Sequence, residues 1–533
     1  MKTPLLLALL LLPLVLCAQS LNDEYMFPGD EAWEDPTYEI LNSPEYSMGG
    51  MLGSATVDGV IYSQVRFMPE LAIWKLGLGL DIDLLLDGEG KIRREGWDNW
   101  ADILRKIFYI RFADRTDSLY FKIGSIPDYT LGHGLVFDDY SNMLRYPKVK
   151  NIGGYLGLNT SSYGFSFEVY THDISKNEII AGRASLQPLR GSKLPLLRKL
   201  KVGVNLGADR NPYGKYPDSD KDGYPDVYDK FPNDSRYWLD TDGDNTPDDI
   251  DFDLNGNGIM DHPDLNPYVN IAFPGIAELY PDYPFDIAVY PDSANQYLDP
   301  TPMLVYSLEY DLPLVEKSNI KLSNYAELAV IDGYGKGLIF PGFSLRWLIF
   351  DTKLELRNFS SRFLPAYFNN LYDEQRCEVV DHSAVSENGR RIYSLTTKDT
   401  MLDGIKASIG WFAYLKVNIA NFAYLKCAYQ DLFGDESIPG KSLWAKLTFM
   451  PEKFPRLREA SLYYAQTDVA ELDLKYPRNT NSRVAGRIVY GYNDYYNLIC
   501  RYAEIYTDLN GDGKIRGSEE TVETITFGVE FQF

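Results

Sequence analysis

The chain has 533 residues, enough for one large fold or about three ordinary domains. Its formal net charge of −24 argues against a nucleic-acid partner, because phosphate binding requires a basic surface. Beyond residue 18, no uncharged apolar stretch approaches the roughly 20 residues that a membrane helix needs. If the chain crosses a membrane, it has to do so with strands whose backbone groups are all paired.

The first 18 residues have the layout of a secretory signal peptide. Lys2 supplies a positive charge, the run from Leu5 to Leu16 is apolar, and Cys17 stands at the expected cleavage site. We therefore expect residues 1–18 to direct export and residues 19–50 to form an N-terminal periplasmic segment. Cys17 leaves a lipidated N-terminus as an alternative.

Polar and apolar residues alternate in many segments of the remaining chain. The clearest of these segments are 76–84, 200–206, 320–330 and 405–419. A period of two predicts strands with one apolar and one polar face. We expect an all-β protein whose strands fall into two groups, within residues 51–208 and 303–533, separated by an insertion at 209–302.

The insertion carries the strongest chemical signal in the chain. Residues 218–264 contain fifteen Asp, no Glu and three basic residues, so the segment repels itself unless cations neutralise it. Asp and Asn recur there at alternate positions in three successive motifs. The first motif contains Asp218, Asp220, Asp222, Asp226 and Asp229; the second contains Asp240, Asp242, Asp244, Asp248 and Asp251; the third contains Asp253, Asn255, Asn257, Asp261 and Asp264.

This spacing has a physical reason. Side chains at alternate positions converge on one ion only if the backbone wraps around it, and a glycine such as Gly223 takes the sharp turn. Hard oxygen ligands in this number favour Ca²⁺. The first motif resembles the thrombospondin type 3 calcium repeat, which implies calcium sites in all three motifs. Asn245 replaces the glycine of the second motif. An acidic disordered linker is the alternative.

A separate motif lies at 508–519. Its candidate ligands are Asp508, Asn510, Asp512, the carbonyl of Lys514 and Glu519. The spacing resembles an EF-hand loop. Because strand-like residues flank it on both sides, we expect a calcium-closed hairpin loop instead of a helix–loop–helix sensor.

The last ten residues alternate to the end of the chain. Ile525, Phe527, Val529, Phe531 and Phe533 share one face. This pattern resembles the C-terminal insertion signal of bacterial outer-membrane β-barrels. The resemblance implies a transmembrane antiparallel β-barrel of about 16–20 strands in the outer membrane, with its apolar face toward lipid. The last strand of a soluble sandwich is the alternative.

Counted back from the C-terminus, long and short connections alternate. The long ones, at 508–520, 468–483, 361–402 and 209–302, then fall outside the cell, as in such barrels. The acidic insertion is therefore expected to be extracellular. The polar residues expected to face the lumen are Asp81, Asp83, Lys199, Lys201, Lys321, Glu327, Lys406 and Lys416.

Two functions are compatible with these patterns. The first is a porin-like channel for small solutes with calcium-stabilised surface loops, in which the turn-rich segment 126–142 folds inward and narrows the pore. The second is a calcium-binding surface structural or adhesion protein that uses the barrel as an anchor. We expect no enzyme, because the four histidines, including His133, form no constellation of acid, base and nucleophile. The expected partners are outer-membrane lipid, calcium and possible solute cargo, without nucleic acid.

Overall fold

The computed structural model describes most of the chain as two compact units. It covers residues 48–532 except 58–59, 94–96, 98–105, 127, 144–150, 227–228, 288–300, 370–371, 386–390, 420–421, 435–439, 451–455, 470, 473–477, 479–481, 494–495, 507–514 and 516–520. Residues up to 208, 304–371 and 402–533 form the first unit, and residues 209–303 and 372–401 form the second. The expected signal peptide and the ligands of the EF-hand-like loop lie outside the described residues.

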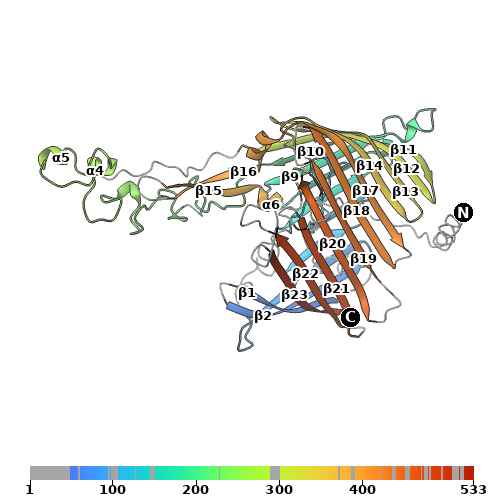
Figure 1. Cartoon of the computed structure of the whole chain (residues 1–533), viewed down its shortest axis with the longest axis horizontal. Coiled ribbons are helices and arrows are strands. Elements are labelled where there is room, and N and C mark those ends of the chain that lie inside the picture. Colours follow the sequence, from blue (N-terminus) through green and yellow to red (C-terminus); the bar gives the residue numbers. More distant parts are fainter. Residues whose placement is uncertain are drawn as a thin grey trace. The chain divides into compact units, whose positions relative to one another are not determined.

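The first unit is built on a 21-stranded sheet (Figure 1). Its strands are β1 (Met48–Val57), β2 (Val60–Ile73), β3 (Leu76–Leu80), β4 (Ile82–Leu86), β5 (Ile107–Phe112), β6 (Leu119–Gly124), β7 (Gly153–Asn159), β8 (Ser166–Thr171), β9 (Ile179–Leu186), β10 (Lys201–Asp209), β11 (Met303–Lys317), β12 (Ile320–Ile331), β13 (Lys336–Trp347), β14 (Phe350–Phe359), β17 (Ser408–Ile419), β18 (Ala423–Gly434), β19 (Lys441–Phe449), β20 (Leu457–Val469), β21 (Ser482–Gly491), β22 (Tyr496–Tyr506) and β23 (Thr521–Gln532). Two 3₁₀ helices, η2 (Ser162–Gly164) and η3 (Leu197–Lys199), lie in its turns.

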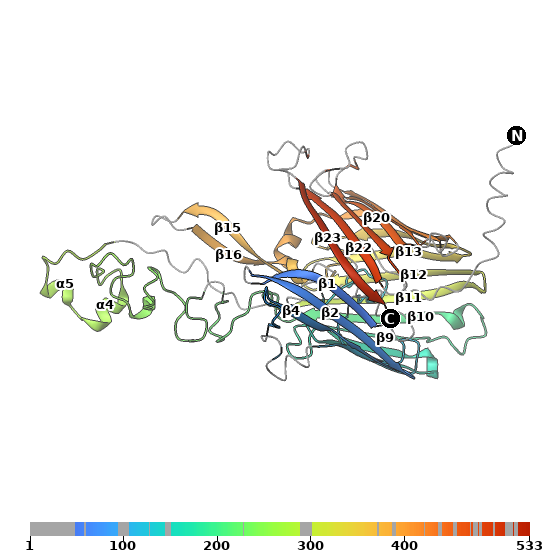
Figure 2. The ribbon, with the colours of Figure 1, turned by 90° about the horizontal axis from the view of Figure 1, so that it is seen from below.

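Antiparallel pairing links neighbouring strands along the chain. β3 and β4 both pair with β2 and are separated only by Asp81, so together they occupy one strand position. The 21 strands therefore fill 20 positions in the sheet. Most of the β1–β2 hairpin lies within the range 51–208 in which strands were expected, although it is not among the clearest alternating segments. β1 also pairs with β23, with Gly49 opposite Gln532 and Leu52 opposite Val529 (Figure 2). The first and last strands of the sheet are therefore neighbours.

The two faces of the sheet have an unusual polarity. In β11, Leu304 and Leu308 are 41% and 57% exposed, whereas Ser307 and Glu309 are 7% and 5% exposed. β17 repeats the pattern, with Ile409 exposed and Gly410, Phe412 and Tyr414 buried. Apolar residues thus cover the exposed face, whereas the buried face mixes charged and polar residues with apolar ones such as Val305 and Phe412. We call the face that carries Glu309 the inner face.

The predicted strands agree with the structure within a few residues. The alternation at 320–330 corresponds to β12, and the described part of that at 524–533, up to Gln532, lies within β23. β17 begins at Ser408, three residues later than predicted, because the 3₁₀ helix η5 (Lys398–Gly404) precedes it. The long connections lie on one edge of the sheet, at 87–106, 125–152, 210–302 and 360–407, whereas no connection on the other edge is longer than 187–200.

The second unit contains little regular structure. It includes η4 (Asp248–Ile250), the helices α4 (Pro267–Ala272), α5 (Ile276–Leu279) and α6 (Tyr372–Gln375), and the hairpin of β15 (Cys377–Val385) and β16 (Arg391–Thr397). α4 begins where the side chain of Asn266 accepts a hydrogen bond from the Tyr268 amide. The ring of Phe252 packs against Tyr268 and Phe273 at 5.1 and 5.3 Å. These ring contacts anchor α4.

Among the described helices, none has the length and apolar character required to cross a membrane.

A buried ion pair fixes the inner face near the start of the sheet. Arg66 donates to both carboxylate oxygens of Asp81, at 2.7 and 3.1 Å, and the two residues are 3% and 0% exposed. Such pairs are costly to break because the remaining charge stays buried.

We expect Asp81→Ala to lower the free energy of unfolding by about 3–5 kcal/mol, since it leaves the Arg66 charge buried. Urea titration of the protein in lipid vesicles measures this. Glu89→Ala, which removes the exposed Lys91–Glu89 pair, is the control and should leave the transition unchanged. Equal effects of the two substitutions would show that the Arg66–Asp81 pair does not stabilise the sheet.

Candidate functional site

The connection between β6 and β7 folds against the inner face. We call its residues 125–143 the inner segment. Tyr129 and Tyr140 exchange backbone hydrogen bonds at 2.9 and 3.0 Å, which closes the segment on itself. Asn142 accepts from the Ile126 amide and donates to the carbonyls of Gly124 and His172. The prediction that residues 126–142 fold inward is confirmed for the described residues.

Aromatic rings hold the inner segment in place. Tyr129, Phe137 and Tyr140 have no exposed surface. Tyr129 stacks on Tyr170 of β8 at 3.9 Å, and Phe137 stacks on Phe368 at 4.1 Å. Rings packed in this way bury a large apolar area and have defined geometry. The segment is therefore a fixed part of the interior.

The tip of the inner segment docks on a carboxylate of β12. Glu327 accepts hydrogen bonds from the amides of His133 and Leu135 at 2.9 and 3.3 Å, and from the Ser307 hydroxyl at 2.6 Å. Gly132 has a φ of +63°, and an added Cβ would lie 2.5–2.8 Å from Glu309, Asn205 and Glu327. A side chain at this position would therefore strain the backbone and require the segment or these three side-chain ends to shift.

Charged side chains of the inner face pair with one another. Arg183 donates from Nε to Glu309 at 2.9 Å. Glu355 accepts from the Tyr325 hydroxyl at 2.6 Å and from Arg357 Nε at 2.8 Å. Low-dielectric surroundings strengthen such contacts and make missing ones costly. These pairs allow a charged interior to pack.

A cavity of about 370 Å³ remains between the inner segment and strands β6 to β14. Its wall is mostly polar and contains equal numbers of acidic and basic residues. The lining residues are Arg115, Tyr120, Asp128, Thr130, Gly132, His133, Asp139, Asn159, Ser166, Phe167, Glu168, Arg183, Lys201, Asp311, Tyr325, Ser344 and Lys353. The volume lies at the lower end of the roughly 300–1,000 Å³ typical of small-molecule sites.

The residues expected to face a lumen divide into two groups. Asp81 and Glu327 are buried on the inner face, and Lys201 lines the cavity. Lys199, Lys321 and Lys406 are exposed, and their lumen-facing position stays a prediction. Their positions at or just before strand starts let these long side chains reach solvent. Asp83 and Lys416 are half-buried. The cavity residues Arg183, Asp311 and Lys353 were not singled out from the sequence, although strand alternation places them on the inner face.

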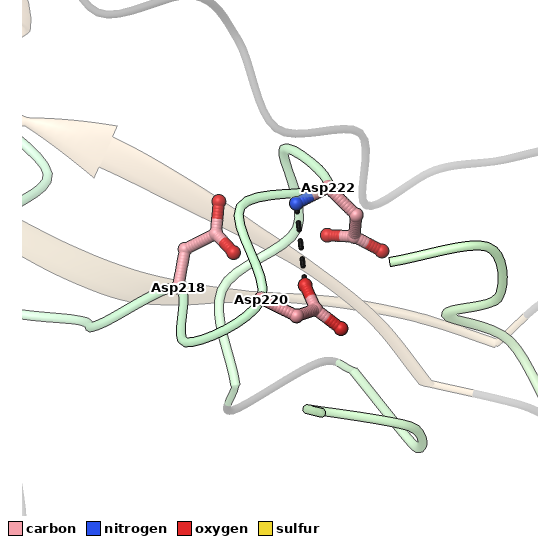
Figure 3. A group of neighbouring side chains, drawn as sticks. All are labelled: Asp218, Asp220 and Asp222. Carbon is pink, nitrogen blue, oxygen red and sulfur yellow. Dashed lines mark hydrogen bonds between the residues drawn. The ribbon is translucent and has the colours of Figure 1, made fainter. Parts of the chain in front are cut away.

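In the second unit, the structure brings together the first three acidic residues of two motifs. One carboxylate oxygen from each of Asp218, Asp220 and Asp222 lies within 4.8 Å of the others, and Asp240, Asp242 and Asp244 form an equivalent group. Figure 3 shows the first group, with the Asp222 amide donating to Asp220 at 3.2 Å. The loop wraps its own carboxylates into one cluster.

All three motifs share one backbone pattern. The carboxylate at the first position accepts hydrogen bonds from backbone amides three to five residues later. The backbone amide at the second position donates to the carboxylate at the ninth position, as Ser219 does to Asp226 at 2.8 Å. The fourth and sixth positions have positive φ in every motif. Asn245 takes this conformation at +70°, which asparagine tolerates, so its replacement of glycine preserves the loop.

The first motif has further oxygen atoms available to a cation. Asp229 is 6% exposed, and its Oδ2 has no hydrogen-bond partner among the described residues, nor does the buried Oδ2 of Asp220. Burial raises the pKa of Asp229, and the nearby charges of Asp222, Asp220 and Asp226 raise it further. Burial and neighbouring carboxylates also raise the pKa of Asp222. Concentrated negative charge with unsatisfied oxygens fits a hard divalent cation.

The third motif is arranged differently. The side-chain amides of Asn255 and Asn257 both donate to Asp286 Oδ2, the latter at 2.6 Å. Asp264 is exposed beside His262. Asp286 thus supplies a carboxylate where the motif has lost two. It lies 22 residues beyond Asp264, and no spacing in the sequence indicates its role.

Comparisons with known proteins give no family assignment. No protein-family model matches the chain. No curated protein matches it either.

Solved structures of low similarity match most of the chain. Wzi of Escherichia coli, an outer-membrane carbohydrate-binding β-barrel involved in group 1 capsule assembly, matches with 8% identity and a TM-score of 0.31, over 93% of this chain and 86% of Wzi. OpdL of Pseudomonas aeruginosa matches with 9% identity and a TM-score of 0.27, over 92% and 96%. The siderophore receptor PirA of Acinetobacter baumannii matches with 8% identity and a TM-score of 0.32, over 92% and 80%. Similarity at this level carries no functional argument.

The raised pKa values of Asp222 and Asp229 predict opposite pH responses with and without calcium. A carboxyl whose pKa rises on folding stabilises the fold below its ordinary pKa of 3.8, and this contribution is lost as the pH rises through the raised value. Calcium requires the ionised carboxylates, so its stabilisation should grow over the same pH range.

Fluorescence of Trp238, which stacks on Tyr224 at 3.8 Å, can follow this unit in the full protein. Urea titrations are carried out at several pH values from 3.5 to 7. The fluorescence of the Trp238→Phe variant is subtracted from that of the unmodified protein, which leaves the signal of Trp238. Identical pH dependence in calcium and in chelator would contradict the prediction.

Proposed function

We propose that the chain is a transmembrane β-barrel of the bacterial outer membrane that acts as a porin-like channel for small solutes. The inverted polarity of the sheet is the observation that carries this proposal. A sheet with exposed leucines outside and buried charges inside suits lipid around it and water or solute within it. Pairing of β1 with β23 supports closure, since lipid tolerates no unpaired strand edge.

The interior supports a narrow channel instead of a wide pore. An unobstructed barrel with 20 strand positions encloses a broad lumen. Here the inner segment packs against the wall and leaves the polar cavity beside it. The expected route for solute passes along this cavity, and its charged wall selects among solutes. No catalytic role is assigned to any residue of the wall.

We further propose that the acidic motifs bind calcium outside the cell. Clustering in the first two motifs and the orphaned oxygen of Asp229 support sites there. Extracellular calcium sites bind with dissociation constants of about 10⁻⁴ to 10⁻³ M. Because calcium outside the cell is high enough to saturate such sites, we infer a permanent structural role for the ion. If the barrel carries no current, this unit becomes the functional part, and the chain is a calcium-binding surface anchor.

The channel proposal predicts that displacing the inner segment enlarges the pore. Gly132→Ala should raise single-channel conductance in planar bilayers, because its methyl group would clash with Glu309, Asn205 and Glu327. Gly90→Ala is the matched control: Gly90 also has a positive φ, of +77°, but no atom lies within 4 Å of its added Cβ. Backbone strain of about 1–2 kcal/mol is then common to both variants.

A silent but inserted protein would overturn the channel proposal. Equal conductance of the two variants would show that the inner segment does not restrict the pore.

The calcium proposal predicts that Asp220→Asn weakens calcium binding by about tenfold or more, since it removes one ligand charge from the first cluster. Asp234→Asn is the control, because Asp234 bonds to Arg236 and lies outside the cluster. Calcium titration by calorimetry of the full mature protein measures both. Unchanged binding in Asp220→Asn would exclude the first cluster as a site.

A further inference from the structure

The cavity wall contains two opposite charges that have no hydrogen-bond or ion-pair partner among the described residues. Lys201 of β10 and Asp311 of β11 both line the cavity. Within the described part of the chain, neither side chain forms a hydrogen bond or an ion pair, and Asp311 Oδ1 is buried. The two charges act on each other electrostatically without a contact within 4.0 Å. Each is therefore available to a third molecule.

These two residues differ from the other charges around them. Arg183 is held by Glu309, and Arg115 lies 3.4 Å from Glu168. These basic side chains of the wall are thus already paired with carboxylates of the protein. Nε2 of His133 is also buried without a hydrogen-bond partner among the described residues. One cation, one anion and one imidazole nitrogen remain for a ligand in the same cavity.

An unpaired charge in a confined site is unfavourable unless a ligand or water compensates it. A simple anion would pair with Lys201 and leave Asp311 alone, and a simple cation would do the reverse. A molecule that carries both charges satisfies both residues at once. The cavity of about 370 Å³ admits a small solute of this kind.

We propose that this cavity selects zwitterionic solutes of the size of α-amino acids, with the carboxylate toward Lys201 and the ammonium toward Asp311. The inference rests on the proposed channel function and names the class of solute that the channel admits.

Three probes of similar size test the proposal: alanine carries both charges, propionate lacks the ammonium, and ethylamine lacks the carboxylate. Binding is measured by calorimetry of the full mature protein in detergent, and permeation by swelling of vesicles that contain it. We expect alanine to bind about tenfold more tightly than either single-charge probe, the typical effect of one charged contact, and to permeate fastest.

Two variants assign the charges. Lys201→Met should reduce alanine binding to the level of ethylamine, and Asp311→Asn should reduce it to the level of propionate. Lys199→Met and Asp332→Asn are matched controls, because both residues are exposed and neither lines the cavity. Both controls should bind alanine as the unmodified protein does.

The outcomes separate this inference from the channel proposal. Conductance with equal binding of the three probes, or with alanine selectivity that survives both variants, would overturn the zwitterion inference and leave the channel. Selective alanine binding without conductance or swelling would support the site and overturn the channel.

Discussion

The structure depends on the requirement that every strand of a sheet with an apolar outer face has a hydrogen-bonded neighbour on both sides. Lipid offers no hydrogen bonds, so an open strand edge in a membrane would leave its amides and carbonyls unsatisfied. Pairing of β1 with β23 meets this requirement. The same geometry forces alternate side chains inward, where Glu309, Glu327 and Glu355 have to find partners.

The inner segment provides hydrogen bonds to one of these buried carboxylates, and arginines pair with the other two. Glu327 is bound by amides of the inner segment, Glu309 of β11 pairs with Arg183 of β9, and Glu355 pairs with Arg357 of its own strand, β14. Because the segment occupies space that water would otherwise fill, it narrows the interior to a cavity. In the proposed channel, restriction of the pore and stability of the wall therefore rest on the same contacts, which links the fold to the proposed selectivity.

Much of the sheet could be predicted because a strand's alternation is local. The run at 405–419 has apolar residues at every second position, and most of it forms the strand β17. β1 and β2 are not among the clearest alternating segments, because glycines at 49, 50 and 53 and short polar residues interrupt the pattern. The contact between His133 and Glu327 joins residues 194 positions apart, and local patterns contain no information about such a pairing.

The acidic motifs were predictable for a similar reason. Their ligand spacing lies within single loops, so the clusters at Asp218–Asp222 and Asp240–Asp244 follow from sequence alone. Asp286, which meets the third motif from outside it, could not be inferred.

The central claim is that the apolar face of the sheet contacts lipid. Nitroxide scanning of residues 408–419, in a variant lacking the native cysteines and reconstituted in vesicles, tests it most directly. Oxygen, which concentrates in the bilayer, should reach labels at Ile409, Trp411, Ala413 and Leu415 more readily than labels at the residues between them. Absence of this alternation, or equal access of a water-soluble reagent to both sets, would contradict a membrane-spanning sheet.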